Sequence, residues 1–182
     1  MKDKFTKKAL SEGYKARSVF KLRDMDRKFN LIKKGNRVLD IGAAPGSWSQ
    51  YAVEKGAIAI AVDIESVNAH KVKYIKADIF DDVLFEKVGT GYDLVMSDAA
   101  PKTTGILDSD NYNSFKLSSR SLDIAKKVLK RKGNYICKIF QGEYFDEFHK
   151  EVKKNFRKLK TIKPEASRKK SKEIYLIGID KL

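Results

Sequence analysis

A short glycine-rich turn between an apolar run and a helical pattern constrains the fold more than any other part of the sequence. The segment Val38–Trp48 reads VLDIGAAPGSW: an apolar strand pattern that carries Asp40 near its end passes at once into a Gly-Ala-Ala-Pro-Gly turn. Such a turn lets the backbone approach a ligand closely and aims the first amide groups of the following helix at it. The segment therefore predicts a nucleotide-type cofactor loop at the carboxyl end of a strand.

The spacing within the turn separates one class of cofactor from others. A dinucleotide-binding loop follows the pattern GxGxxG, but Ala44 stands where the second glycine belongs, and Pro45 lacks an amide donor for a pyrophosphate. The Gly-Lys-Ser/Thr ending of a P-loop is also absent. A loop with so few phosphate-binding features suits a nucleoside cofactor without phosphates, of which S-adenosylmethionine is the common one.

Acidic residues at the ends of the next two apolar runs agree with that cofactor. Asp63 follows the turn by about 20 residues, where an acid accepts hydrogen bonds from ribose hydroxyls. Asp78 ends the next run, in position to bind an adenine amino group, with Ile79 as a packing neighbour. We expect the cofactor to contact the turn and these runs, at Gly42, Ala44, Pro45, Gly46, Ser47, Trp48, Asp63, Ile64, Asp78 and Ile79.

Apolar runs alternate with helical patterns along the rest of the chain. Runs at 37–41, 57–63, 72–77, 92–97, 134–139 and 174–179 are almost wholly apolar, which is typical of strands covered on both faces. Helical patterns cover 18–30, with Ser18 as a candidate N-cap, and 47–55, 114–132 and 144–155. The alternation predicts an α/β fold with a mostly parallel sheet. We expect one domain over residues 1–182, with a basic segment and helix at 1–34 and the core at 35–182.

Positive charge is concentrated at both ends of the chain. The net charge is +15, from 39 Lys and Arg against 24 Asp and Glu. Residues 1–34 hold twelve basic and four acidic residues, residues 147–182 hold twelve and five, and the middle holds fifteen of each. Two basic flanks around a neutral middle favour a polyanionic partner, nucleic acid before membrane. The alternative is a lysine-rich surface that serves only solubility.

Cysteine and histidine are scarce, which excludes several classes of protein. One Cys and two widely spaced His provide neither a disulfide framework nor a multi-cysteine metal site, so we expect no metal and a reducing, cytoplasmic location. No apolar run approaches the roughly 20 residues of a membrane span, and the first residues lack a hydrophobic signal core. Neither membrane insertion nor secretion is expected.

Four further residues are candidates for chemistry. Asp98 follows the fourth apolar run (YDLVMSD), at the end of a central strand where open α/β sheets bind ligands. Lys138 interrupts an apolar strand pattern (YICKIF), and a buried ammonium is costly, so it is paired, neutral or functional. The alternative is a strand lysine that reaches solvent at a sheet edge. Glu173 opens the last run, and Lys21 lies on the first predicted helix.

Five segments together resemble the FtsJ, or RlmE, family of large-subunit ribosomal RNA (uridine-2'-O-)-methyltransferases. They are GYKARSVFKL, VLDIGAAPGSWSQ, DLVMSDAAP, CKIFQG and SRKKSKEIYLIG, in this order and spanning nearly the whole chain. The resemblance implies a Rossmann-like class I methyltransferase fold, with a seven-stranded sheet whose last strand is antiparallel. It also implies S-adenosylmethionine as cofactor and a catalytic tetrad at Lys21, Asp98, Lys138 and Glu173. The family's cofactor contacts fall on Gly46, Trp48, Asp63, Asp78 and Asp98, while Ser47 replaces its commoner glycine.

The same resemblance leads to expectations about mechanism and partners. Lys138 would accept the proton of a ribose 2'-hydroxyl, Lys21 would supply a second positive charge or orient the ribose, and Asp98 and Glu173 would hold the lysines. A lysine must be neutral to act as a base. Burial and the second lysine favour the neutral amine, whereas the two acids favour the charged one. The sequence does not decide which effect is larger. The expected substrate is RNA, in large-subunit ribosomal RNA or a ribosomal particle, with the protein a monomer.

Two alternatives to this function stay open. One is a transfer-RNA or messenger-RNA-cap 2'-O-methyltransferase with the same tetrad, and the other is a non-catalytic RNA-binding or ribosome-assembly module of the same fold. The segment SDAAP lacks the aromatic residue of adenine-N6 enzymes, which disfavours base methylation.

Further expected RNA contacts lie near both ends of the chain, and segment 102–113 is expected to be a loop that covers the site. The contacts are Tyr14, Arg17, Arg23, Arg168, Lys169, Lys170 and Lys172.

Overall fold

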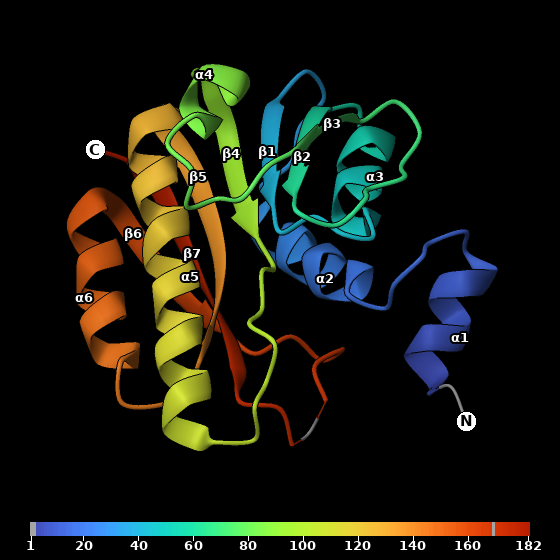
Figure 1. The fold of residues 1–182 in the computed structure, drawn as a ribbon. Coiled ribbons are helices and arrows are strands. Elements are labelled where there is room, and N and C mark those ends of the chain that lie inside the picture. Colours follow the sequence, from blue (N-terminus) through green and yellow to red (C-terminus); the bar gives the residue numbers. More distant parts are fainter. Residues whose placement is uncertain (1–2, 169) are drawn as a thin grey trace.

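One twisted sheet of seven strands organises the molecule, with helices on both of its faces (Figure 1). The computed structural model describes residues 3–168 and 170–182. The strand order is β3-β2-β1-β4-β5-β7-β6, with all pairs parallel as far as β5 and with β7 antiparallel to both β5 and β6. This confirms the α/β class, the mostly parallel sheet and the reversed last strand. The strands are β1 (Arg37–Ile41), β2 (Ile58–Asp63), β3 (Lys73–Lys76), β4 (Tyr92–Ser97), β5 (Leu129–Phe140), β6 (Phe156–Ile162) and β7 (Glu173–Lys181).

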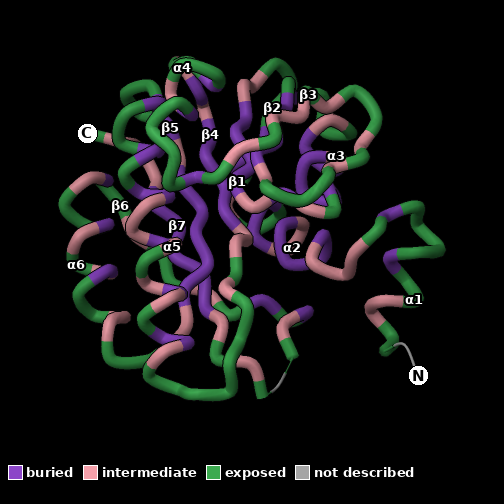
Figure 2. The backbone as a smooth tube through the Cα atoms, in the orientation of Figure 1, coloured by how far each residue is buried: buried purple, intermediate pink, exposed green. Residues whose placement is uncertain are grey.

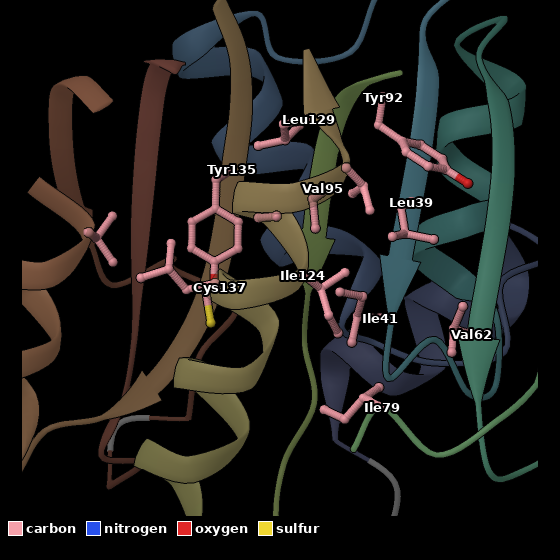
Figure 3. Close-up of a cluster of buried hydrophobic side chains, with 14 of the residues drawn as sticks. Leu39, Ile41, Val62, Ile79, Tyr92, Val95, Ile124, Leu129, Tyr135 and Cys137 are labelled. Atoms are coloured by element: carbon pink, nitrogen blue, oxygen red, sulfur yellow. The ribbon is translucent and has the colours of Figure 1, made fainter. Parts of the chain in front are cut away.

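The helices divide between the two faces according to their position in the chain. One buried cluster joins the sheet to α1 (Lys4–Ser11), α2 (Val19–Phe29) and α3 (Ser47–Glu54). The other joins it to α4 (Leu84–Val88), α5 (Leu107–Val128) and α6 (Phe145–Asn155), and part of it is drawn in Figure 3. The buried stretches of the tube in Figure 2 follow the central strands, as expected for a sheet that is covered on both sides.

Alternation along β5 and β7 decides which side chains face α2. Tyr135 and Cys137 belong to the cluster under α4–α6, whereas Ile136 belongs to the cluster under α1–α3. Successive strand residues point to opposite faces, so Lys138 shares the α2 face with Ile136. Its partner across the antiparallel pair is Tyr175, which also belongs to that cluster. The strand register therefore places Lys138 and Tyr175 beneath the helix that carries Lys21.

Several element boundaries differ from the sequence-based predictions. Strand β6 was not predicted because it is an edge strand in which only its first residue is fully buried, so it contains no apolar run. Helices α1 and α4 were also missed; they have eight and five residues. Helix α5 starts at Leu107, seven residues before the predicted start, and part of the expected loop 102–113 is therefore helical. It ends at Val128 because the next residues already belong to β5.

The N-cap assigned to Ser18 was wrong in its chemistry. Ser18 does precede α2, but its side chain makes no capping hydrogen bond and its backbone is already helical, with φ −57° and ψ −23°. Its carbonyl oxygen instead accepts a hydrogen bond from Trp48 Nε1 at 2.8 Å. The start of α2 is thus held by a tertiary contact to α3.

Gly178 makes room for the packing of the reversed strand. A Cβ at this position would lie 2.6 Å from the ring of Phe156, which stacks on Tyr135 at 5.8 Å between centroids.

We predict that Gly178→Ala lowers the free energy of unfolding by about 1–3 kcal/mol, the cost of forcing extra volume into a packed core. Urea denaturation measures it, with the exposed β6 change Thr161→Ala as control, expected within about 0.5 kcal/mol of wild type. An undiminished stability of Gly178→Ala would contradict this packing.

Candidate active site

A cavity of about 530 Å³ lies at the carboxyl ends of the central strands. Seven of the predicted cofactor residues line it, together with the segment that follows β4. Open α/β sheets bind ligands at this edge, where the strand order reverses between β1 and β4. The predicted residues at its wall are Gly42, Ala44, Asp63, Ile64, Asp78, Ile79 and Asp98.

Gly42 allows the turn after β1 to approach the segment after β4. Its φ is +68°, and a Cβ there would lie 2.6 Å from the Cβ of Ala99. A side chain at this position would meet both a strained backbone and a neighbouring chain segment. The close approach forms the floor between the two walls of the cavity.

Asp63 and Asp78 hold backbone amides as well as lining the cavity. Asp63 Oδ2 accepts the amide N–H of Ala44 at 2.8 Å, and its Oδ1 accepts that of Glu65 at 2.8 Å. Asp78 Oδ1 accepts the amide N–H of Phe80 at 2.9 Å. A carboxylate has about four acceptor positions, so each retains capacity for a ligand hydroxyl or amino group. Asp63 thus also fixes the turn that the sequence identified.

Asp40, the acid inside β1, lies below the cavity and not on its wall. It is 1% exposed, its Oδ2 accepts the hydroxyl of Ser49 at 2.6 Å, and its Oδ1 has no hydrogen-bond partner. Burial raises the pKa of Asp40 to about 7, and the charges of Asp98 and Asp63 act in the same direction, while the Ser49 hydrogen bond opposes them. The carboxyl group is therefore only partly ionised near neutral pH.

Four predicted cofactor residues in and after the turn lie outside the lining of this cavity. Trp48 is 2% exposed, and its ring packs 6.0 Å from that of Tyr175 in the core beneath α2. The Ser47 hydroxyl is buried and accepts the amide N–H of Ala16 at 2.9 Å. Gly46, with φ +110°, precedes α3, and Pro45 follows Ala44 through a cis peptide bond. Cofactor contacts at Pro45, Gly46, Ser47 and Trp48 stay predictions.

The four tetrad residues form two ion pairs. Lys138 Nζ lies 3.0 Å from Asp98 Oδ1 and donates a hydrogen bond to the Asp98 carbonyl oxygen at 2.6 Å. Lys21 Nζ lies 2.6 Å from Glu173 Oε1. Both lysines are buried, at 7% and 8% exposure. Burial of a charged amine is tolerable here because each has a carboxylate partner.

Tyr175 connects the two pairs, and the sequence analysis did not identify it. Its hydroxyl donates a hydrogen bond to Asp98 Oδ1 at 2.7 Å, and Lys21 Nζ lies 5.7 Å from the centre of its ring. Burial, followed by the charges of Asp98 and Glu173, raises the pKa of Tyr175 well above its usual range, so the hydroxyl stays a donor. A signal was available, because Tyr175 is two residues after Glu173 and so lies on the same face of the strand.

The tetrad stands between two cavities. Asp98 lines the large cavity, whereas Lys21 and Glu173 line a second cavity of about 260 Å³ with Arg17 and Arg168. We call this second cavity the basic cavity. The arrangement can place a cofactor on one side of the lysines and an anionic substrate on the other.

The remaining residues expected to contact RNA have different surroundings. Tyr14 is buried and its hydroxyl hydrogen-bonds to Glu54, which makes it a packing residue. Arg23 is 2.8 Å from Glu12, while Lys170 and Lys172 are exposed. Lys169 lies outside the described residues.

The single cysteine and His149 lie outside the linings of both cavities. Cys137 is buried with its Sγ 3.3 Å from Ser121 Oγ, and His149 lies against Phe145 at 5.8 Å. Among residues 3–168 and 170–182, no group of three metal-ligating side chains is placed to hold an ion. No helix within those same ranges is both long and apolar enough to span a membrane.

Comparisons with known proteins identify the family of this chain. The family of FtsJ-like methyltransferases matches residues 14–181. A ribosomal RNA large subunit methyltransferase E of Borreliella afzelii is 47% identical, over 98% of this chain and 97% of its own. The protein of the same name from Bdellovibrio bacteriovorus is 44% identical, over 99% of this chain and 97% of its own.

A solved structure shows the same fold. It comes from Plasmodium falciparum, its description names a ribosomal RNA methyltransferase, and it superposes with a TM-score of 0.83 at 29% identity, covering 93% of this chain and 99% of that one. The cavity lies where the strand order reverses between β1 and β4, and the relatives match nearly the full length of the chain. The chain belongs to the FtsJ-like methyltransferase family and is an S-adenosylmethionine-dependent methyltransferase.

Proposed function

We propose that the protein transfers a methyl group from S-adenosylmethionine to the 2'-hydroxyl of a uridine ribose in large-subunit ribosomal RNA. The observation that carries this proposal is the position of the two ion pairs: Asp98, the partner of Lys138, lines the large cavity, and Lys21 and Glu173 line the basic cavity. The relatives named as ribosomal RNA large subunit methyltransferases support the substrate class. The protein acts as a single-domain monomer in the cytoplasm, on RNA within a ribosomal particle.

The large cavity fits the cofactor. Asp63 and Asp78 have free acceptor positions for ribose hydroxyls and an adenine amino group, and Ile79 offers an apolar wall. Gly42 lets the turn after β1 pack against Ala99 at the floor of the cavity. When bound, S-adenosylmethionine supplies a methyl group on a positively charged sulfur, so the protein has only to position and deprotonate the nucleophile.

The tetrad can carry out that deprotonation. Lys138, in its neutral form, accepts the proton of the 2'-hydroxyl, and Asp98 orients its amine through the 3.0 Å contact. Lys21 places a second amine near the acceptor ribose, where it orients the substrate. Glu173 holds Lys21 at 2.6 Å, and Tyr175 keeps Asp98 in place through its hydroxyl. Arg17 and Arg168 bind the phosphates beside the acceptor ribose.

The substrate proposal is tested by mapping 2'-O-methyl groups by mass spectrometry in RNA from cells with and without the gene. We predict the loss of methylation at a single uridine of large-subunit ribosomal RNA when the gene is absent. Restoring the gene should restore the methyl group. Loss of a methyl group from a transfer RNA instead, with ribosomal RNA unchanged, would contradict the assigned substrate.

Lys138→Ala tests the base. We predict a fall in the methyl-transfer rate of about 10²–10⁴-fold, the usual contribution of a positioned general base, with cofactor affinity within several-fold of wild type. Single-turnover methylation gives the rate and calorimetry gives the affinity. Lys158→Ala, which removes an exposed strand lysine on β6, should retain the wild-type rate. Near-normal turnover by Lys138→Ala would remove it from this role.

Asp63→Ala tests the cofactor side of the site. The change removes the carboxylate from the cavity wall and from the Ala44 amide, and we predict a cofactor dissociation constant raised by about 10- to 150-fold, as for loss of a hydrogen bond to a charged group. Isothermal titration calorimetry measures it. Asp123→Ala, on the exposed side of α5, is the matched control. An unchanged affinity in Asp63→Ala would contradict the ribose assignment.

A further inference from the structure

Helix α1 precedes residues 14–181, which the family model matches, and it lies at the periphery of the molecule (Figure 1). Together with α2 it forms a groove. The groove has a volume of about 210 Å³ and is lined from α1 by Phe5 and Lys8, and from α2 by Phe20, Arg23 and Arg27. We call it the α1–α2 groove. We propose that it binds an unpaired RNA base next to the methylated nucleotide, an inference that rests on the proposed function.

The aromatic content of the groove fits a base. The rings of Phe5 and Phe20 lie 5.8 Å apart, and Phe5 is half-buried on the wall of the groove. Three cations accompany them: Lys8 Nζ lies 5.3 Å and the Arg23 guanidinium 5.2 Å from the centre of the Phe20 ring, and the Arg17 guanidinium lies 5.2 Å from that of Phe5. Proteins that bind single-stranded RNA stack bases on aromatic rings and guanidinium planes within a positively charged surface. The groove combines these elements.

The two acidic residues of the groove favour the binding of a nucleobase over the binding of a phosphate alone. Asp24 and Glu165 also line it, and Asp24 already lies 3.2 Å from Lys28 and 3.7 Å from Arg27. A carboxylate repels phosphate, but it accepts hydrogen bonds from the amino groups of base edges. A surface with three basic residues, two acids and two rings therefore suits a nucleobase whose backbone runs along the basic side.

The groove is fixed relative to the catalytic tetrad. It shares the residue Ala166 with the basic cavity, where Lys21 and Glu173 lie. Arg17 secures this wall: its guanidinium lies 2.6 Å from Asp3, the N-cap of α1, and donates a hydrogen bond to the Ala166 carbonyl oxygen at 2.5 Å. Neighbouring nucleotides of one strand can thus occupy the basic cavity and the groove together. This gives a role to α1, which contributes only Ala9 to the buried core.

The test measures the affinity for large ribosomal subunits isolated from cells that lack the gene. Phe5→Leu keeps an apolar side chain but removes the ring, and we expect the dissociation constant to rise roughly 5- to 150-fold, the loss associated with one stacked base. The slope of affinity against salt should not change, because no charge is removed. Phe5→Tyr restores the ring and should restore binding. Thermal melting and cofactor affinity, both unchanged, show that each variant is folded.

Two lysines on α1 distinguish binding in the groove from nonspecific electrostatic attraction. Lys8 lines the groove, whereas Lys7 is exposed and does not line it. We expect Lys8→Gln to weaken binding and to reduce the salt slope by about 0.7–0.9, and Lys7→Gln to leave both as in wild type. Equal effects of the two lysine changes, or wild-type affinity in Phe5→Leu, would contradict the proposal that the groove binds an RNA base. A wild-type protein that methylates no ribosomal RNA would instead overturn the proposed function.

Discussion

The buried ion pair between Lys138 and Asp98 is the interaction on which the arrangement of the site depends. The lysine is 7% exposed in an otherwise apolar strand, and breaking such a pair leaves an uncompensated charge in the interior. Asp98 can serve as partner because it directly follows β4, which pairs with β5. The hydroxyl of Tyr175 and the amine of Lys138 converge on the same carboxylate oxygen. Removal of the Asp98 carboxylate would therefore leave the Tyr175 hydroxyl without its partner and Lys138 with only the Asp98 carbonyl oxygen.

The reversal of β7 explains how Glu173 reaches this pair. Parallel strands deliver residues to the cofactor edge only at their carboxyl ends, as β4 delivers Asp98. An antiparallel strand delivers residues there at its start, and Glu173, the first residue of β7, is paired with Phe140, the last residue of β5. Helix α2 completes the site from one face of the sheet, where Lys21 meets Glu173. The cofactor side is thus formed at the ends of the parallel strands, and the substrate side by α2 and the start of the antiparallel strand β7.

The sequence predicted the parts of the site whose signals are local. The turn at Gly42 and the acids Asp63 and Asp78 stand directly at strand ends, and the structure brings them to one cavity. The antiparallel direction of the last strand was predicted from the family resemblance, because hydrophobic periodicity carries no information on strand direction. Tyr175 lies two residues after Glu173 on the same face of β7, but its contact with Asp98 depends on the register between β5 and β7, and it was therefore missed. The indole N–H of Trp48, whose contact with the cofactor stays a prediction, donates to the Ser18 carbonyl oxygen, and this contact depends on how α2 packs on α3.

The central claim is that Lys138 takes the proton from the 2'-hydroxyl, and the pH dependence of the single-turnover rate tests it most directly. With saturating cofactor and RNA, the wild-type rate should rise with pH, because a general base must be unprotonated to accept the proton. In Lys138→Ala the residual rate should not show that rise. A wild-type rate that is independent of pH, or the same rise in Lys138→Ala, would contradict the account.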